Sequence, residues 1–209
     1  MRVALNLVFL VPGETGGMEV YARELLPRLA AIEGLEPVAI VNRVAAEDRD
    51  APWSAGALRS VVAPVDARDR KQWVWGEQRH VPRLARQVGA DLVHSLASTG
   101  PARWAGGPPR ITTVHDLHYA VVPDAHFGLR GLGMRLLVPA AVKASRRVIA
   151  DSQATKDDVA RIIDFPAKRI DVVHLATTLP PADAPATPEA ELRERLQLGE
   201  RPKIGRAHV

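Results

Sequence analysis

Hydrophobic runs rich in β-branched residues alternate along the chain with segments of helical periodicity. The first run covers residues 2–11, and the apolar positions from Met18 to Ile32 then recur at spacings of three and four. Such spacing places one apolar stripe on a helix, which Gly34 is suited to end. Strands alternating with helices are typical of a parallel sheet covered on both faces. We therefore predict an α/β, Rossmann-like, doubly wound fold with a mainly parallel sheet and helices on both faces.

The same pattern locates the remaining elements and the domain boundaries. Ser152 stands between a predicted strand and a predicted helix, where its hydroxyl can cap the first free amides. We expect one domain over residues 1–176, and then a linker and helix over 177–203 that lead to a further domain. Further strands are predicted at 37–41, 58–62, 91–96, 110–114, 147–150 and 170–174, and further helices at 70–88, 129–144, 153–163 and 189–198.

The last six residues break this pattern. Residues 204–209 read Ile-Gly-Arg-Ala-His-Val, which is also the translation of one frame of a common DNA-sequencing adapter. We expect them to be a non-native tail and leave them out of the fold prediction.

Composition narrows the protein class. The chain is 46% hydrophobic and 25% charged, as in a soluble globular protein, and its apolar runs are too short to span a bilayer. It has no cysteine, which excludes disulfides and thiolate metal sites and fits a reducing compartment, so we expect a cytoplasmic location. A net charge of +4 favours an anionic partner, with an ordinary solvated basic face as the alternative.

A glycine-containing loop, residues 12–17, separates the first strand from the first helix. Glycines let backbone amides approach a ligand at the positive end of a helix, so this loop is a candidate phosphate or sugar contact. The spacing differs from G-x-G-x-x-G, so no dinucleotide cofactor is indicated. The alternative interpretation is a tight strand-to-helix turn.

Polar residues also follow the strand predicted at 110–114. His115 and Asp116 come directly after it, and His118 and Tyr119 follow. Ligands of doubly wound sheets bind at the carboxyl ends of the strands, where an imidazole can bond a sugar hydroxyl or oppose a phosphate charge. Alternatively His115 caps a loop and Asp116 forms a turn. No further zinc ligands accompany them at a suitable spacing, so no metal site is predicted.

A basic segment with two tryptophans opens the helix predicted at 70–88. This composition suits an anionic membrane interface or a nucleic-acid backbone. We favour the alternative of a solvated helix whose tryptophans pack on the core, because apolar residues along it already define a core-facing stripe. The residues of the segment are Arg68, Arg70, Lys71, Trp73 and Trp75.

Five short segments, in order and at plausible spacing, together resemble glycosyltransferase family four. No Walker loop, H-E-x-x-H motif or Ser-His-Asp order competes with this resemblance. It extends from Arg2 to about Lys203. The segments are Gly16-Gly17-Met18-Glu19, Asp91-Leu92-Val93-His94, Thr113-Val114-His115-Asp116-Leu117, Ala150 to Lys156 and Ile170-Asp171-Val172-Val173-His174.

The resemblance implies an enzyme with two facing Rossmann-like domains that transfers a sugar from a nucleotide donor with retention of configuration and without a metal. It implies that Gly16 and Gly17 lie near the donor diphosphate and the acceptor, and that His115 faces the transferred sugar. Ser152 then lies near the interdomain cleft, and we place Glu19, Asp116 and His118 among the donor- or acceptor-binding residues.

The expected function is therefore that of the acceptor-side domain of a retaining glycosyltransferase of the hexosyltransferase type, inactive without its donor-binding domain. Its partners would be a nucleotide sugar and a glycan or lipid-linked acceptor, with possible peripheral membrane contact and no nucleic acid. The alternatives are a non-catalytic basic module that binds anionic membrane or nucleic acid, and a nucleotide-sugar epimerase of related fold.

Overall fold

The computed structural model describes residues 1–54, 56, 58–102, 106–121, 129–176, 187–197 and 199, with only the backbone described at 129–132. The chain divides into two compact units, residues 1–174 and 175–209. The expected tail at 204–209 and most of the expected linker lie outside the described residues.

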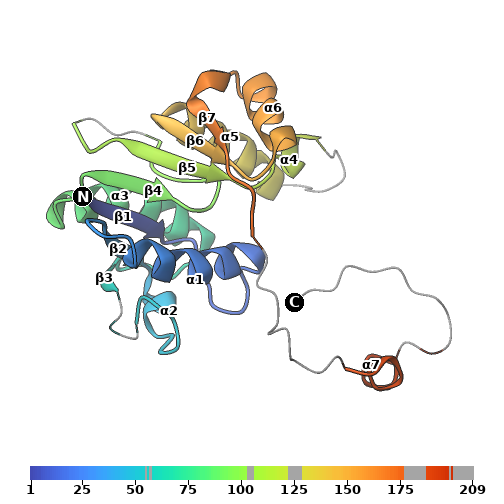
Figure 1. Ribbon diagram of the computed structural model, residues 1–209. Helices are drawn as coiled ribbons and strands as arrows, with labels where there is room; N and C mark the ends of the chain where they lie inside the picture. The colour runs from blue at the N-terminus through green and yellow to red at the C-terminus, as the bar shows by residue number, and fades with distance from the viewer. Residues whose placement is uncertain are drawn as a thin grey trace. The chain divides into compact units, whose positions relative to one another are not determined.

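The first unit is built on a seven-stranded sheet (Figure 1). Its strand order is β3-β2-β1-β4-β5-β6-β7, and each pairing between neighbouring strands in this order is parallel. The sheet is thus parallel throughout, not only mainly so as predicted. The strands are β1 (Arg2–Leu7), β2 (Glu36–Val41), β3 (Arg59–Val62), β4 (Leu92–Ser95), β5 (Arg110–Val114), β6 (Arg147–Ala150) and β7 (Ile170–Val172).

The predicted helices are present, and their C-terminal ends fall one to three residues before the predicted ones. Two four-residue helices, α2 (Arg43–Ala46) and α4 (His118–Val121), were not predicted because one turn is too short to show a periodicity. The longer helices are α1 (Gly17–Ala30), α3 (Arg70–Gln87), α5 (Leu129–Lys143), α6 (Gln153–Ile162) and α7 (Glu189–Arg195), and a 3-10 turn covers Ala167–Arg169. Of these, α7 belongs to the second unit.

Strand β1 is central and is buried on both faces. Its odd-numbered residues pack with α1, where Ala22 and Leu26 are fully buried, and its even-numbered Ala4 packs with Val81 of α3. Successive side chains of a strand point to opposite faces, so each face of β1 belongs to a separate core. Helices α1 and α3 therefore cover opposite sides of the sheet.

A buried polar cluster interrupts the α3 side of this core. The Asn6 amide of β1 donates to Glu77 Oε1 at 3.0 Å, and the Thr99 hydroxyl donates to the same oxygen at 3.1 Å. Glu77 is 1% exposed, so its carboxylate has almost no contact with water. Burial outweighs the bonds to the carboxylate and raises the pKa of Glu77 to about 7.

The Glu77→Gln variant should change how stability depends on pH. Between pH 4.5 and about 7 the folded protein holds a proton on Glu77 that the unfolded chain releases, so this group lowers stability as pH rises. Glutamine cannot ionise. The unfolding free energy of the variant relative to wild type should therefore increase from pH 4.5 to 7, by at most on the order of 3 kcal/mol.

Urea unfolding of both proteins at several pH values checks this prediction. His94, whose pKa burial lowers to about 4, contributes an opposite slope below pH 6.5, but it does so equally in both proteins. A difference between the two proteins that stays constant with pH would contradict the assignment.

Candidate functional site

The sheet places its candidate residues along one edge. The strand order reverses beside β1, since the chain first adds β2 and β3 on one side and then β4 to β7 on the other. Ligands of doubly wound sheets bind beyond the carboxyl ends of the strands at such a reversal. The loop after β1, Leu96 after β4, His115 after β5 and Asp151 after β6 all lie at this edge.

The glycine loop leads directly into α1. Gly16 is the N-cap residue with a φ of 62° and a ψ of −133°, a conformation that an L side chain avoids, and Gly17 is the first helical residue. A Cβ built on either glycine meets no atom within 4 Å. Gly16 and Gly17 are also exposed, so the start of α1 is accessible, as a binding site for an anion or sugar oxygen requires.

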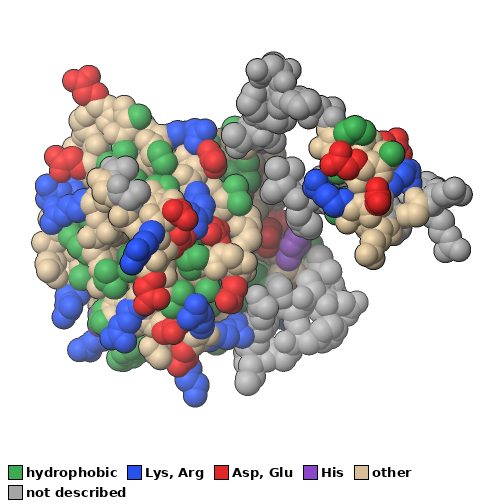
Figure 2. All heavy atoms as spheres, turned by 90° about the horizontal axis from the view of Figure 1, so that it is seen from below, with side chains coloured by type: hydrophobic (Ala, Val, Ile, Leu, Met, Phe, Trp, Pro, Cys, Tyr) green, Lys and Arg blue, Asp and Glu red, His purple; other side chains and the backbone are tan. Residues whose placement is uncertain are grey.

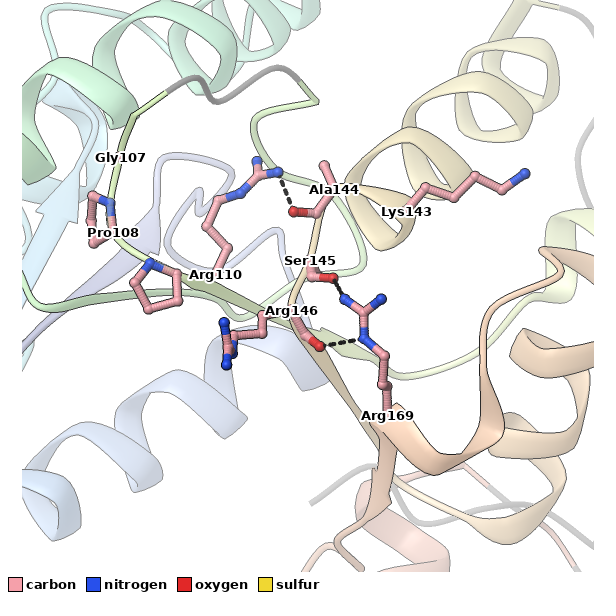
Figure 3. Close-up of a pocket in the computed structure, with 9 residues that line it drawn as sticks. Gly107, Pro108, Arg110, Lys143, Ala144, Ser145, Arg146 and Arg169 are labelled. Atoms are coloured by element: carbon pink, nitrogen blue, oxygen red, sulfur yellow. Dashed lines mark hydrogen bonds between the residues drawn. The ribbon is translucent and has the colours of Figure 1, made fainter.

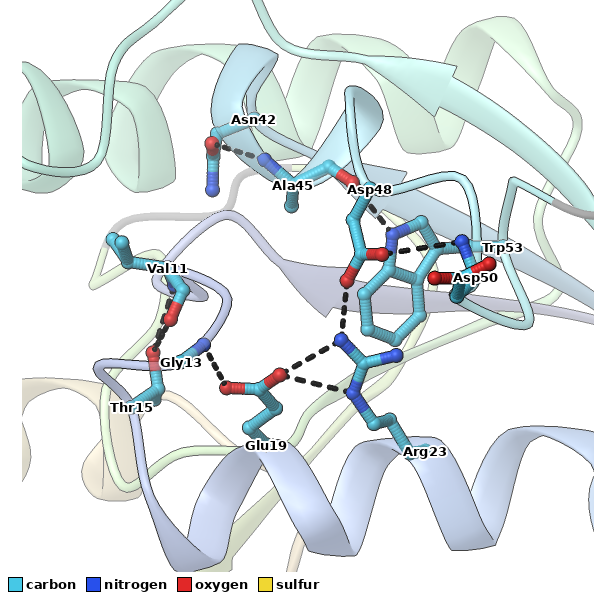
Figure 4. A network of polar contacts seen from close by, with 10 residues as sticks. All are labelled: Val11, Gly13, Thr15, Glu19, Arg23, Asn42, Ala45, Asp48, Asp50 and Trp53. Carbon is cyan, nitrogen blue, oxygen red and sulfur yellow. Dashed lines mark hydrogen bonds and ion pairs between the residues drawn. The ribbon is translucent and has the colours of Figure 1, made fainter.

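Glu19 holds the loop from within the protein (Figure 4). Its Oε2 accepts from the Gly13 amide at 2.8 Å, while its Oε1 accepts from the Arg23 guanidinium at 2.8 and 2.9 Å. Arg23 also pairs with Asp48 and lies 5.3 Å from the centre of the Trp53 ring. The Glu19 carboxylate, expected to bind donor or acceptor, is thus engaged by the loop and by Arg23.

Replacing Arg23 tests whether this network stabilises the domain. Glu19, Arg23 and Asp48 are 11%, 29% and 16% exposed, so Arg23→Met would leave two largely buried carboxylates without this cation. We expect a loss of about 1–3 kcal/mol in unfolding free energy.

The matched control is Arg28→Met, because Arg28 forms an exposed pair with Glu24 on the same helix. Its cost should stay under about 0.5 kcal/mol. Equal losses in both variants, measured by urea unfolding, would show that the network contributes nothing beyond an exposed pair.

His115 is held at the carboxyl edge by both of its ring nitrogens. Nδ1 lies 2.6 Å from Asp151 Oδ2, and Nε2 lies 2.8 Å from the Leu96 carbonyl oxygen. The Tyr21 ring of α1 meets the imidazole edge-on, with 5.2 Å between ring centres. Burial lowers the pKa of His115, but the bond and the charge of Asp151 raise it by more, so the net shift is upward.

The other predicted residues divide into two groups. Ser152 caps α6 as predicted, accepting from the Thr155 amide at 3.1 Å, and the Thr155 hydroxyl donates to the His115 carbonyl. Ser152 and His115 are therefore close neighbours. Asp116 and His118 are more than half exposed, with 3.5 Å between His118 Nδ1 and Asp116 Oδ2.

Sequence reasoning missed Asp151 and Tyr21. The position of Asp151 could have revealed it, because this residue follows the strand at 147–150 just as His115 follows the strand at 110–114. Tyr21 gave no such signal, since its place in the apolar stripe of α1 is that of an ordinary core residue.

The two tryptophans of the basic segment have different environments. Trp73 is partly buried against two core clusters, as we favoured, but Trp75 is 61% exposed, so the prediction that both pack on the core is wrong. Residues two apart on a helix lie about 200° around its axis from each other, so they cannot share the buried face. Basic and acidic side chains are interspersed on the face in Figure 2, so the net charge there forms no single patch.

A hollow of about 420 Å³ lies at the opposite edge of the sheet (Figure 3). It is lined by Arg110, which begins β5, by Lys143, which ends α5, and by Arg169 just before β7. The Arg110 guanidinium donates to the Ala144 carbonyl at 2.6 Å, and that of Arg169 donates to the carbonyls of Ser145 and Arg146. Arg110 and Arg169 thus bond the backbone carbonyls that follow the end of α5, which is a structural role for both side chains.

The described residues contain no group of three or more His, Cys, Asp or Glu side chains placed to hold a metal ion. No helix among them is long and apolar enough to cross a bilayer.

Comparison with known proteins identifies the family. Residues 15–178 match the model of Glycosyltransferase Family 4. The chain belongs to this family. A comparison with curated protein sequences finds no match.

Solved structures show the same fold at low sequence identity. The apo lipopolysaccharide outer core galactosyltransferase WaaB aligns with a TM-score of 0.55 and 11% identity, over 89% of this chain and 51% of its own. A sucrose-phosphate synthase chain from Thermosynechococcus elongatus aligns with a TM-score of 0.53 and 15% identity, over 95% and 97%.

The fold alone does not separate transferases from epimerases. The UDP-GlcNAc 2-epimerase of Methanocaldococcus jannaschii aligns with a TM-score of 0.55 and 11% identity, over 83% of this chain and 45% of its own. The chain therefore spans about half the length of the WaaB and epimerase chains. The family match, and not the structural likeness, favours the transferases.

Proposed function

We propose that this chain is the acceptor-side domain of a retaining glycosyltransferase, which moves a hexosyl group from a nucleotide sugar to a hydroxyl of a glycan or lipid-linked acceptor. The observation that carries the proposal is the convergence of the open α1 N-terminus, His115 and Ser152 at one edge of the sheet in a member of this family. Most donor contacts would come from a carboxy-terminal domain, since the chain spans only half of WaaB.

The chemistry explains why two domains are needed. As the glycosidic bond of the donor breaks, the diphosphate leaves with its negative charge, and nearby donors and cations must stabilise it. The α1 amides and the His115 ring supply part of this stabilisation. We therefore expect the 209-residue chain to bind diphosphate groups weakly and to lack transferase activity, and we expect the reaction to need no metal.

A titration of the isotopically labelled chain with uridine diphosphate tests this proposal. We expect a dissociation constant in the millimolar range and amide shifts centred on Gly16, Gly17 and His115. Shifts confined to the hollow around Lys143 would contradict it. Release of uridine diphosphate from a sugar nucleotide by the chain alone, with an acceptor present, would contradict the expected inactivity.

A second function, docking on an anionic membrane surface, is favoured by the exposed face of α3. Lys71, Trp75, Arg79 and Arg83 recur every four residues, so they follow one another along one side of the helix, and all four are exposed. The one acidic residue of α3, Glu77, is buried. A solvent-facing tryptophan among cations suits the headgroup region of a bilayer, and this contact would bring the domain to a lipid-linked acceptor.

Sedimentation with vesicles distinguishes docking from a merely solvated helix. Binding to phosphatidylglycerol-containing vesicles should fall at least fivefold in Arg79→Glu/Arg83→Glu, because about 1 kcal/mol is lost per cation at the surface. The charge-matched control Arg28→Glu/Arg161→Glu, on exposed sites of α1 and α6, should bind more like wild type.

Trp75 provides a second, local measurement. Its fluorescence should shift to shorter wavelength on vesicles, and Trp75→Ala should remove that shift. Equal losses in both charge-reversed variants, or binding to oligonucleotides as tight as to vesicles, would contradict docking through this face.

A further inference from the structure

Asp151 and His115 are brought together by the register of the sheet. Val114 of β5 pairs with Ala150 of β6, so the residues that follow them leave the sheet side by side at its carboxyl edge. The Asp151 carboxylate then lies 2.6 Å from His115 Nδ1, and the two side chains are 14% and 16% exposed. This geometry is set by strand pairing and not by a flexible loop.

Both partners of the His115 ring are hydrogen-bond acceptors. A carboxylate oxygen and the Leu96 carbonyl can only accept, so each ring nitrogen must donate to make both bonds. A neutral imidazole has a single N–H. The two contacts together therefore require the doubly protonated, positively charged ring.

The groups around the ring are compatible with this charge. From α1, Tyr21 faces the ring, and the pKa of its phenol is raised: burial and the charge of Asp151 raise it by more than the bond to Thr113 lowers it, so the phenol stays neutral. From β4, His94 has a pKa lowered to about 4 by burial and by the charge of His115, so it is neutral too. The adjacent Asp116 carboxylate adds a small favourable charge. Asp151 is thus the main counter-charge of the His115 ring.

The pair is not arranged for maximal stability. Asp151 Oδ1 is buried and has no hydrogen-bond partner among the described residues. A buried carboxylate oxygen without a partner costs free energy, and such arrangements concentrate at functional sites. This cost favours a role for the pair in binding over one in folding.

We propose that Asp151 is the positioning residue of His115: it fixes the ring through Nδ1 and leaves the Nε2–H as a donor that a ligand oxygen takes over from the Leu96 carbonyl. This inference rests on the proposed function, in which that oxygen belongs to the diphosphate or the sugar of the donor. Because Asp151 keeps the orientation of the ring, the Leu96 carbonyl must move aside or share the Nε2–H with the ligand oxygen. Nε2 then carries both a hydrogen bond and a positive charge to the ligand.

Nuclear magnetic resonance of the labelled 209-residue chain tests the positioning role without any enzyme assay. In Asp151→Asn the pKa of His115 should fall to the ordinary histidine value or below it, because the main counter-charge is gone. In the charge-matched control Asp116→Asn it should remain raised, and Asp151→Glu should restore part of the shift. An unchanged His115 pKa in Asp151→Asn overturns the proposal.

Binding of uridine diphosphate across pH tests the role toward the ligand. Wild-type binding should weaken as His115 loses its proton, and in Asp151→Asn this loss should move to lower pH, while spectra confirm that the variant is folded. A lowered His115 pKa without a matching change in the binding profile overturns the ligand role. Absence of wild-type binding at every pH counts against the proposed function instead, and the pKa measurement still decides whether Asp151 positions the ring.

Discussion

The parallel arrangement of the strands is the constraint on which the site depends. Because every strand runs in the same direction, every strand ends at the same edge, and a residue that follows one strand meets the residue that follows its neighbour. His115 and Asp151 are 36 positions apart in the chain and yet form a bond of 2.6 Å for this reason. The same constraint brings Leu96, at the end of β4, to the other nitrogen of the His115 ring.

Burial of the sheet on both faces gives this edge its electrostatic character. Side chains near the ends of the strands, such as His94 and Asn6, are enclosed by helices on both sides and lose their contact with water. Polar groups there must be satisfied by one another, and a charged group must be balanced by a partner. Burial therefore lowers the pKa of His94 to about 4, whereas for His115 the bond and charge of Asp151 outweigh burial and raise the pKa.

The two candidate ligand-binding elements are held by different means. The glycine loop is braced by Glu19, which in turn is held by Arg23 and, through it, by Asp48 beyond β2. His115 is fixed by strand register and by the Asp151 carboxylate. The first arrangement leaves Gly16 and Gly17 exposed at the start of α1. The second directs His115 Nε2 toward the Leu96 carbonyl, whose place we propose a ligand oxygen takes.

The local pattern of residues was enough to predict the helices and strands, and the motifs were enough to predict the family. Strands β5 and β6 coincide with the predicted ranges, and Ser152 caps α6 as its position before the helix predicted. Both predictions succeed because periodicity and capping are local properties of the chain. The glycines and His115 were likewise predicted to lie at a ligand-binding edge from their place after strands.

The contacts that these residues make depend on how the chain folds. In the folded chain the Glu19 carboxylate bonds Arg23 and the glycine loop, and His115 bonds Asp151. Trp73 packs on the core, whereas Trp75 is exposed. Each outcome depends on atoms supplied by another segment of the chain, so no local pattern carries the information. A histidine in a sequence has no fixed charge, and it acquires one when the fold places a carboxylate beside it.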